Sequence, residues 1–449
     1  MGVGTYDLTV SRRSRILVPV FAAILVVAGL LALVWWQLTQ SQNKFLAQLR
    51  NPGTEQTSSQ DGFTEDAQSD PDPVIDAGDI VLLHLRQGDL LSVQGEWALA
   101  EAEYQIAVDH DGGLPALRKL AQAQLQRRNI PAARATIERL KAGGARREDL
   151  LLMEVIVALR TGEVVQAETQ LNDAAESPQK HYGLALVAII KADHATAKTE
   201  LAAVVSGWDP TLRAYARTLQ GAYEEFALFP ESSPVHLQTL LARALAQAQE
   251  CELALPLLSQ VLEQKQDYRD AWMVQGYCEL TSERTQQAIA SFDKAYELDP
   301  EKPEIQYFLG RAHLALKDWK SAATFLSYAL ENGFTPEKEA RRHLATAAME
   351  LNDAPLAIEQ LTILLSLPDA DYGIADSLVS ILLAQNRTAD AYDIARTATT
   401  RWPEDARAHD LFAKAALASD KKDEARAALE KALQLDPTLQ SARERYGAL

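Results

Sequence analysis

The sequence predicts an all-α solenoid of about ten helix pairs in two arrays, with one N-terminal transmembrane helix. Three observations lead to this fold class. A charge-free apolar segment near the start is long enough to span a membrane. The chain beyond residue 80 is rich in Ala and Leu, with apolar residues at helical spacing. A period of 34 residues runs through its second half, which is typical of stacked helical repeats.

Composition limits the classes of function. The 449 residues exceed what one ordinary core can bury, so several domains or a repeat array are expected. A net charge of −18 disfavours a broad nucleic-acid-binding surface, and we expect no nucleic-acid partner. Only two cysteines are present, which excludes a disulfide framework and any all-cysteine metal site.

A transmembrane helix is predicted over residues 16–38, after a short basic segment at 1–15. Ile16 to Trp36 is an apolar run of 21 residues, and a helix of that length spans about 32 Å. Trp35 and Trp36 end the run as interfacial aromatic residues do. The alternative is a cleaved signal peptide, but its apolar region is usually shorter, and this run lacks a small-residue cleavage site.

Basic residues on either side of this segment predict its orientation. Three arginines precede it closely and two basic residues follow it: Arg12, Arg13, Arg15, Lys44 and Arg50. The bias places the N-terminus in the cytoplasm and the bulk of the chain outside it. Residues 39–80 follow as an acidic disordered linker, because residues 51–80 hold eight acidic residues, no basic ones and no periodic apolar pattern.

The repeat is strongest over residues 235–437, the predicted C-terminal array. Six units of 34 or 35 residues begin at Val235, Arg269, Pro303, Lys338, Tyr372 and Ala406. Their twentieth residue is always alanine: Ala254, Ala288, Ala322, Ala357, Ala391 and Ala425. The eighth residue is mostly small and the twenty-fourth mostly large. Small residues let two antiparallel helices approach closely while the large residue fills the space beside them, so each unit is predicted to be a helix pair that stacks on its neighbours.

Weaker units of the same kind begin at Val81, Leu114, Glu148 and Pro178. They predict a degenerate N-terminal array over residues 81–210. The fourth unit follows the third after only 30 residues, and we expect the shortening in its inter-helix turn. Residues 211–234 are predicted to be a connecting helix and joint between the arrays, and residues 438–449 a capping helix with a polar outer face.

These units resemble the tetratricopeptide repeat family. The best unit, Arg269–Lys302, has the tryptophan, the small residues, the aromatic residue and the proline of that family at positions 4, 8, 20, 24 and 32: Trp272, Gly276, Ala288, Phe292 and Pro300. The resemblance implies a helix-turn-helix solenoid with other proteins or peptides as partners. The chain also looks like bacterial single-anchor repeat proteins that assist envelope assembly, which implies an inner (cytoplasmic) membrane location with the repeats in the periplasm.

In that family the first helix of each unit lines a concave groove. The resemblance therefore implies a set of groove candidates: Arg243, Met273, Tyr277, Tyr307, Arg311 and Arg342. Two tyrosines and a methionine beside several arginines suit an extended peptide or a C-terminal carboxylate. The alternative is a solvated face with incidental aromatic residues.

Cys251 and Cys278 leave two interpretations open. They occupy position 17 of one unit and position 10 of the next, which stacking can bring together, and an extracytoplasmic location would permit a disulfide. Alternatively they are two small buried apolar residues. Their spacing does not decide, because a disulfide depends on geometry.

We expect no catalytic chemistry, metal, cofactor or small-molecule substrate. There is no Gly-Lys dipeptide for a phosphate-binding loop, and the eight histidines lack zinc-protease spacing. The predicted function is a non-catalytic, membrane-anchored adaptor or holdase that binds envelope proteins or peptides in its groove. The alternative is a structural scaffold subunit that uses the convex face. An enzyme would need a pocket that the sequence does not indicate.

Overall fold

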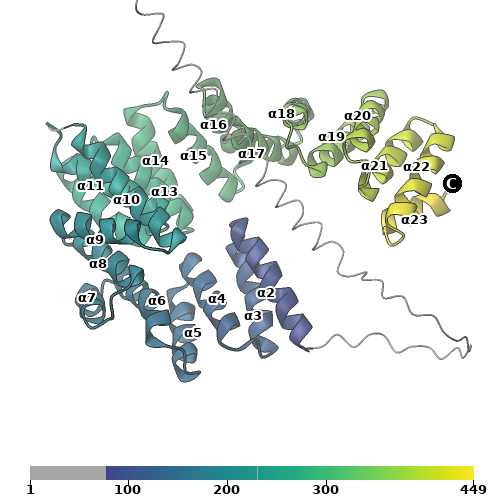
Figure 1. The fold of residues 1–449 in the computed structure, drawn as a ribbon. Helices are drawn as coiled ribbons and strands as arrows, with labels where there is room; N and C mark the ends of the chain where they lie inside the picture. Colours follow the sequence, from purple (N-terminus) through teal and green to yellow (C-terminus); the bar gives the residue numbers. More distant parts are fainter. Residues whose placement is uncertain (1–76, 230) are drawn as a thin grey trace, which may run out of the picture. The chain divides into compact units, whose positions relative to one another are not determined.

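The computed structural model describes residues 77–229 and 231–449 of the chain (Figure 1). Within these residues every regular element is an α-helix, which confirms the predicted all-α repeat solenoid. The predicted segments 1–15 and 16–38, and most of the predicted linker, lie outside the described residues. Among the helices that are described, none combines the length and the apolar character of a membrane span.

Ten helix pairs follow one another in the described chain, with one single helix after the fourth pair and another at the end. The first four pairs are α2 (Ala77–Val93) with α3 (Trp97–Asp109), α4 (Gly113–Gln126) with α5 (Ile130–Ala142), α6 (Arg147–Arg160) with α7 (Val164–Asn172), and α8 (Pro178–Ile190) with α9 (His194–Ser206). The single helix α10 (Pro210–Ala227) packs against α9 and α11.

The later pairs continue in the same order along the chain (Figure 1). They are α11 (Pro234–Gln247) with α12 (Cys251–Gln264), α13 (Arg269–Thr281) with α14 (Thr285–Leu298), α15 (Pro303–Ala315) with α16 (Trp319–Glu331), α17 (Glu337–Glu350) with α18 (Ala354–Ser366), α19 (Tyr372–Ala384) with α20 (Thr388–Arg401), and α21 (Ala406–Ala418) with α22 (Lys422–Leu435). The last helix, α23 (Gln440–Gly447), packs on α22.

Two details differ from the sequence prediction. Helix α2 begins at Ala77, ahead of the predicted start at Val81, because a first helical turn precedes the apolar residues that suggested the boundary. The shortening between the third and fourth units lies in the second helix of the third unit, and not in an inter-helix turn. Helix α7 has 9 residues where α5 has 13. It ends early because Ser177 and Pro178 already cap and start α8.

A left-handed backbone residue closes the first helix of every described pair. These residues, one in each turn, are Gly95, Arg128, Gly162, Ala192, Gln249, Glu283, Lys317, Asn352, Asn386 and Asp420. In the turn between α11 and α12, Gln249 has φ 67° and the next N–H, that of Glu250, donates to the Leu245 carbonyl at 2.8 Å. This hydrogen bond satisfies a carbonyl at the helix end and reverses the chain.

Close helix contacts explain the repeat pattern. All ten position-20 alanines are 0–1% exposed, six in the later units and four in the earlier ones (Ala100, Ala133, Ala167 and Ala197). A Cβ atom added to Gly276 would lie 2.6 Å from the ring of Phe292, and one added to Gly310 would lie 2.6 Å from Leu326. The small residue at position 8 is therefore required where the large residue at position 24 crosses it.

Candidate functional site

The first helices of three consecutive units enclose a pocket of about 250 Å³, called here the groove pocket. Its lining comes from α11, α13 and the start of α15: His236, Thr239, Leu240, Arg243, Tyr268, Arg269, Asp270, Met273, Val274, Lys302 and Glu304. Two of the predicted groove residues, Arg243 and Met273, thus meet in one cavity. The other four lie outside its lining.

The cations of the groove pocket already have acidic partners. The pairs are Arg243 with Glu225 of α10, Arg269 with Asp270 at 2.7 Å, and Lys302 with Glu304 at 3.0 Å. A hydrogen bond of 2.8 Å joins the Tyr268 hydroxyl to Nδ1 of His236. Burial raises the pKa of Tyr268, so its hydroxyl stays protonated at neutral pH. The pocket therefore offers apolar surface and hydrogen-bonding groups, and a carboxylate that approaches Arg243 would compete with Glu225.

Tyr307 is a core residue, which corrects its prediction as a groove contact. Its side chain is only 3% exposed, and its ring stacks on Phe334 with 4.0 Å between centroids. The hydroxyl donates to Glu339 at 3.2 Å. Phe334, in the loop before α17, packs on the Tyr307 ring and helps to bury it.

Arg311 lies beside this covered ring and is partly buried. Its guanidinium carbon is 5.8 Å from the Tyr307 ring centroid and 5.9 Å from that of Phe308, which are cation–π distances. Tyr277 meets Phe308 edge to face at 5.5 Å. In the part of the chain that the structure describes, Arg311 forms no ion pair with an acidic side chain. Tyr277, Phe308 and Arg311 are called the aromatic–arginine patch.

Arg342 does not join this patch. It is exposed on α17 and pairs with Asp371 at 2.6 Å, across the boundary to the next unit. Because both side chains are about half exposed, the pair is worth little energetically, and its guanidinium is already engaged. Of the six predicted groove residues, the structure therefore brings Arg243 and Met273 into the pocket, and Tyr277 and Arg311 into the neighbouring patch.

The two cysteines are buried together between the first two units of the second array. Both side chains are 0% exposed, and both are free thiols in this structure. Sγ of Cys251 lies 3.5 Å from Oγ1 of Thr281. The contact between the thiols lowers the pKa of Cys251 and raises the pKa of Cys278, with burial adding to the second shift. The disulfide between them stays a prediction.

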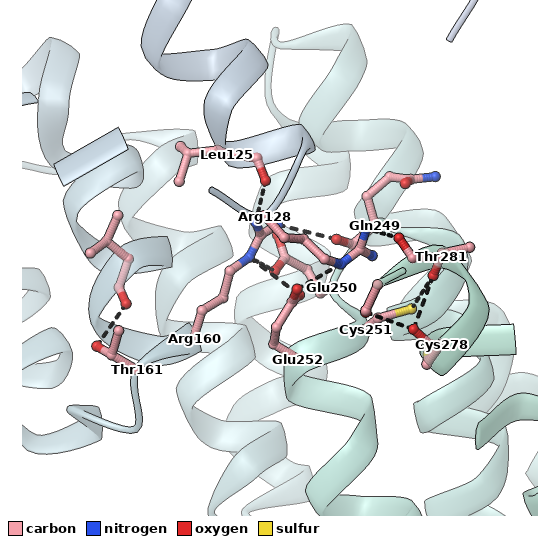
Figure 2. A network of polar contacts seen from close by, with 12 residues as sticks. Leu125, Arg128, Arg160, Thr161, Gln249, Glu250, Cys251, Glu252, Cys278 and Thr281 are labelled. Carbon is pink, nitrogen blue, oxygen red and sulfur yellow. Dashed lines mark hydrogen bonds and ion pairs between the residues drawn. The ribbon is translucent and has the colours of Figure 1, made fainter. Parts of the chain in front are cut away.

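A buried ionic network that sequence reasoning missed lies next to these thiols (Figure 2). Arg160 at the end of α6 pairs with Glu250 at 3.0 Å, with side chains only 3% and 8% exposed. Arg128, in the turn between α4 and α5, pairs with Glu252 at 2.6 Å. These four residues, the inter-array network, join the first array to the second. No periodic pattern marks them, because their partners lie about ninety residues or more away along the chain.

Backbone carbonyls complete the inter-array network. Arg160 also donates to the carbonyls of Leu125 at 2.6 Å and Gln249 at 3.1 Å, and Arg128 donates to that of Thr281 at 3.1 Å. Burial raises the pKa of Glu250, and the charge of Arg160 opposes that rise. Each guanidinium thus binds both charge and helix-end carbonyls, so the contact is specific in its geometry.

A second, larger cleft of about 650 Å³ lies between α12, α13 and α14. Its lining includes Leu262, Trp272 and Leu298 among polar and charged side chains. Two of its carboxylates, Glu263 and Asp267, form no ion pair within residues 77–229 and 231–449. We call it the acidic cleft. The described residues hold no group of His, Cys, Asp and Glu side chains that could bind a metal ion.

The repeat units of the chain match the sequence models of a known repeat family. A tetratricopeptide repeat model matches residues 85–148, 239–303 and 377–439, and a second tetratricopeptide repeat model matches residues 279–338. Together they cover just over half of the chain. The chain belongs to the tetratricopeptide repeat family. As a member of this family, it is a protein-binding adaptor or scaffold, with proteins or peptides as partners.

Several solved structures are similar to parts of this chain. YrrB, a protein with an unusual peptide-binding site, is 19% identical with a TM-score of 0.37, over 42% of this chain and 97% of its own. PilW, a type IV pilus biogenesis factor, is 17% identical with a TM-score of 0.34, over 48% and 99%. Yeast Tom70 is 14% identical with a TM-score of 0.29, over 83% and 96%. No curated protein matches this tetratricopeptide repeat protein significantly.

Proposed function

We propose that this protein is a non-catalytic, membrane-anchored adaptor that holds an extended peptide segment of an envelope protein along its second array. The observation that carries the proposal is the groove pocket, which three consecutive first helices build. Met273 in the pocket and Tyr277 in the aromatic–arginine patch lie one turn apart on α13, so the two surfaces are neighbours. The pocket suits an apolar side chain, and Arg311 suits a carboxylate a few residues away along the same peptide.

Replacing Met273 and Arg311 together by alanine is expected to weaken peptide binding about tenfold or more, because an apolar contact and the positive charge of Arg311 are both removed. Binders are selected from a random peptide display library on the full-length chain in detergent micelles, and their affinities are measured by fluorescence anisotropy. The matched control is Met349→Ala with Arg426→Ala, two exposed residues of the same types outside the pocket and the patch. Wild-type affinity in the groove variant contradicts the proposal.

A second candidate function, a scaffold that binds a partner outside the groove pocket, is supported by the acidic cleft between α12, α13 and α14. Its carboxylates and apolar floor suit a partner segment with basic residues flanking an apolar one. The charge reversal Glu263→Lys with Asp267→Lys distinguishes the two functions. Binding that is lost in the cleft variant and kept in the groove variant assigns the partner surface to the cleft, whereas the opposite result assigns it to the groove.

The proposed anchor rests on the apolar run from Ile16 to Trp36, and its proposed orientation rests on the basic residues on either side of that run. We expect the repeat domain to be digested by added protease in intact spheroplasts, because it lies on the outer side of the inner membrane. A cytoplasmic marker protein in the same sample must stay intact. Protection of the repeats until detergent lysis would reverse the proposed orientation and move the partner search to cytosolic proteins.

A further inference from the structure

The buried thiols lie next to the residues of the second array that Arg128 and Arg160 contact (Figure 2). Cys251 is flanked in the chain by Glu250 and Glu252, the two acidic members of that network. Cys278 lies one helical turn before Thr281, whose carbonyl accepts from Arg128 at 3.1 Å. Arg128 therefore forms an ion pair with Glu252, the residue after Cys251. It also donates a hydrogen bond to Thr281, the last residue of the helix that carries Cys278.

This arrangement closes the thiols to solvent while it leaves them next to each other. Both side chains are fully buried, and the Thr281 hydroxyl contacts the Cys251 sulfur at 3.5 Å. A buried thiol reacts only when its surroundings open locally, and the contacts that hold the surroundings set how often this happens. Here those contacts include Arg128, which belongs to the other array.

We propose that Cys251 and Cys278 are an oxidation site that a disulfide-bearing reagent reaches only when Arg128 releases α12 and α13. Cys251 is the first residue of α12, where the helix N-terminus favours the thiolate, so it is the attacking sulfur. The inference does not depend on peptide binding in the groove, since it concerns bonds within the chain.

The reaction is a thiol–disulfide exchange with a small or protein disulfide as oxidant. The Cys251 thiolate attacks one sulfur of the oxidant, whose S–S bond breaks, and the other sulfur leaves as a thiolate. The Cys278 thiolate then attacks Cys251 in the mixed disulfide and releases the second thiolate of the oxidant. The two protons lost by the cysteines go to the two released thiolates. The protein loses two electrons, and the oxidant gains them.

The test measures the rate at which oxidised glutathione bridges the reduced full-length chain, by acid quench, alkylation of remaining thiols and mass spectrometry. Arg128→Ala is expected to form the intramolecular disulfide roughly tenfold faster than the wild type, since a charged hydrogen-bonding contact no longer opposes opening. The matched control is Arg127→Ala, whose side chain pairs with Glu101 inside the first array at 2.6 Å. It should react at the wild-type rate. Equal rates in Arg128→Ala and wild type overturn the proposal.

Two further variants keep the proposal falsifiable if Arg128→Ala folds poorly. Glu252→Gln weakens the same contact from the second array and should also accelerate bridging, in protein with the wild-type circular dichroism spectrum. In Cys278→Ser the glutathione adduct should accumulate on Cys251, whereas in Cys251→Ser the remaining thiol should react more slowly. An unchanged bridging rate in Glu252→Gln overturns the proposal that the Arg128 contact controls access to the thiols. Faster adduct formation in Cys251→Ser than in Cys278→Ser overturns the assigned order of attack.

Discussion

Replacing Arg160 by alanine is expected to lower the free energy of unfolding by about 3–5 kcal/mol, because it leaves the buried carboxylate of Glu250 without its charge partner. The same change removes donors from the carbonyls of Leu125 and Gln249. Urea unfolding followed by circular dichroism measures the loss. The control is Arg134→Ala, which breaks an exposed pair with Glu163 at 3.3 Å and should cost no more than about 1 kcal/mol.

The pH dependence gives this prediction a second check. Without Arg160, the pKa of Glu250 rises further above its ordinary value of 4.5, since burial is then opposed less. A carboxyl whose pKa is higher in the folded state adds stability below its unfolded pKa and loses it as pH rises through the folded pKa. The deficit of Arg160→Ala should therefore be largest at neutral pH and shrink as pH falls toward 4.5. If the loss of unfolding free energy in Arg160→Ala instead grew as the pH fell, burial of Glu250 would be contradicted.

A double variant separates charge from packing at the same place. Arg160→Met with Glu250→Leu removes both charges and keeps similar side-chain volume, so it should recover most of the stability that Arg160→Ala loses. If the double variant is as unstable as the single one, the carbonyl contacts of Arg160 hold the arrays together, and the ion pair does not.

The repeating residue pattern was sufficient to predict the helix pairs. It could not predict the inter-array network, because the residues of that network are far apart along the chain. The packing roles of Ala288 and Phe292 could be predicted, because similar residue types recur every 34 residues and each unit packs on its neighbours. Arg160 and Glu250 belong to different arrays and lie 90 residues apart along the chain, so their contact depends on how the two arrays pack. No repeat register contains that information. Tyr307 was predicted as a groove contact, and its burial was missed for a similar reason, since the residue that covers it, Phe334, lies in a loop outside the helical pattern.

The inter-helix turns show another limit of the sequence. A left-handed residue reverses the chain in each described pair, yet only Gly95 and Gly162 are glycines. Residues such as Lys317 and Glu283 adopt this conformation at a cost of roughly 1 kcal/mol or more each, which the packing of the flanking helices offsets. The recurring alanines predicted the helix pairs that these turns join, whereas turn composition alone would have missed most of the turns.

Phe292→Ala is expected to destabilise the second array by about 3–5 kcal/mol, because it empties the centre of the unit that best matches the family. The ring is 0% exposed and stacks on Phe308 with 5.7 Å between centroids. It also fills the space that the missing side chain of Gly276 leaves. Urea unfolding, read out by circular dichroism, measures the loss. Because Phe308 belongs to the aromatic–arginine patch, the change should also weaken binding of selected peptides.

The converse substitution tests the same contact from the opposite helix. Gly276→Ala places a methyl group 2.6 Å from the Phe292 ring and should cost about 1–3 kcal/mol through overpacking, although alanine favours helices more than glycine does. Combining it with Phe292→Leu should cost less than the sum of the two single changes, since the smaller side chain makes room for the methyl group. Gly221, in α10, has open space around it, so Gly221→Ala should be neutral or stabilising. A stabilising Gly276→Ala would mean that α13 and α14 can separate freely, and close helix approach would then not explain the small residues of the repeat.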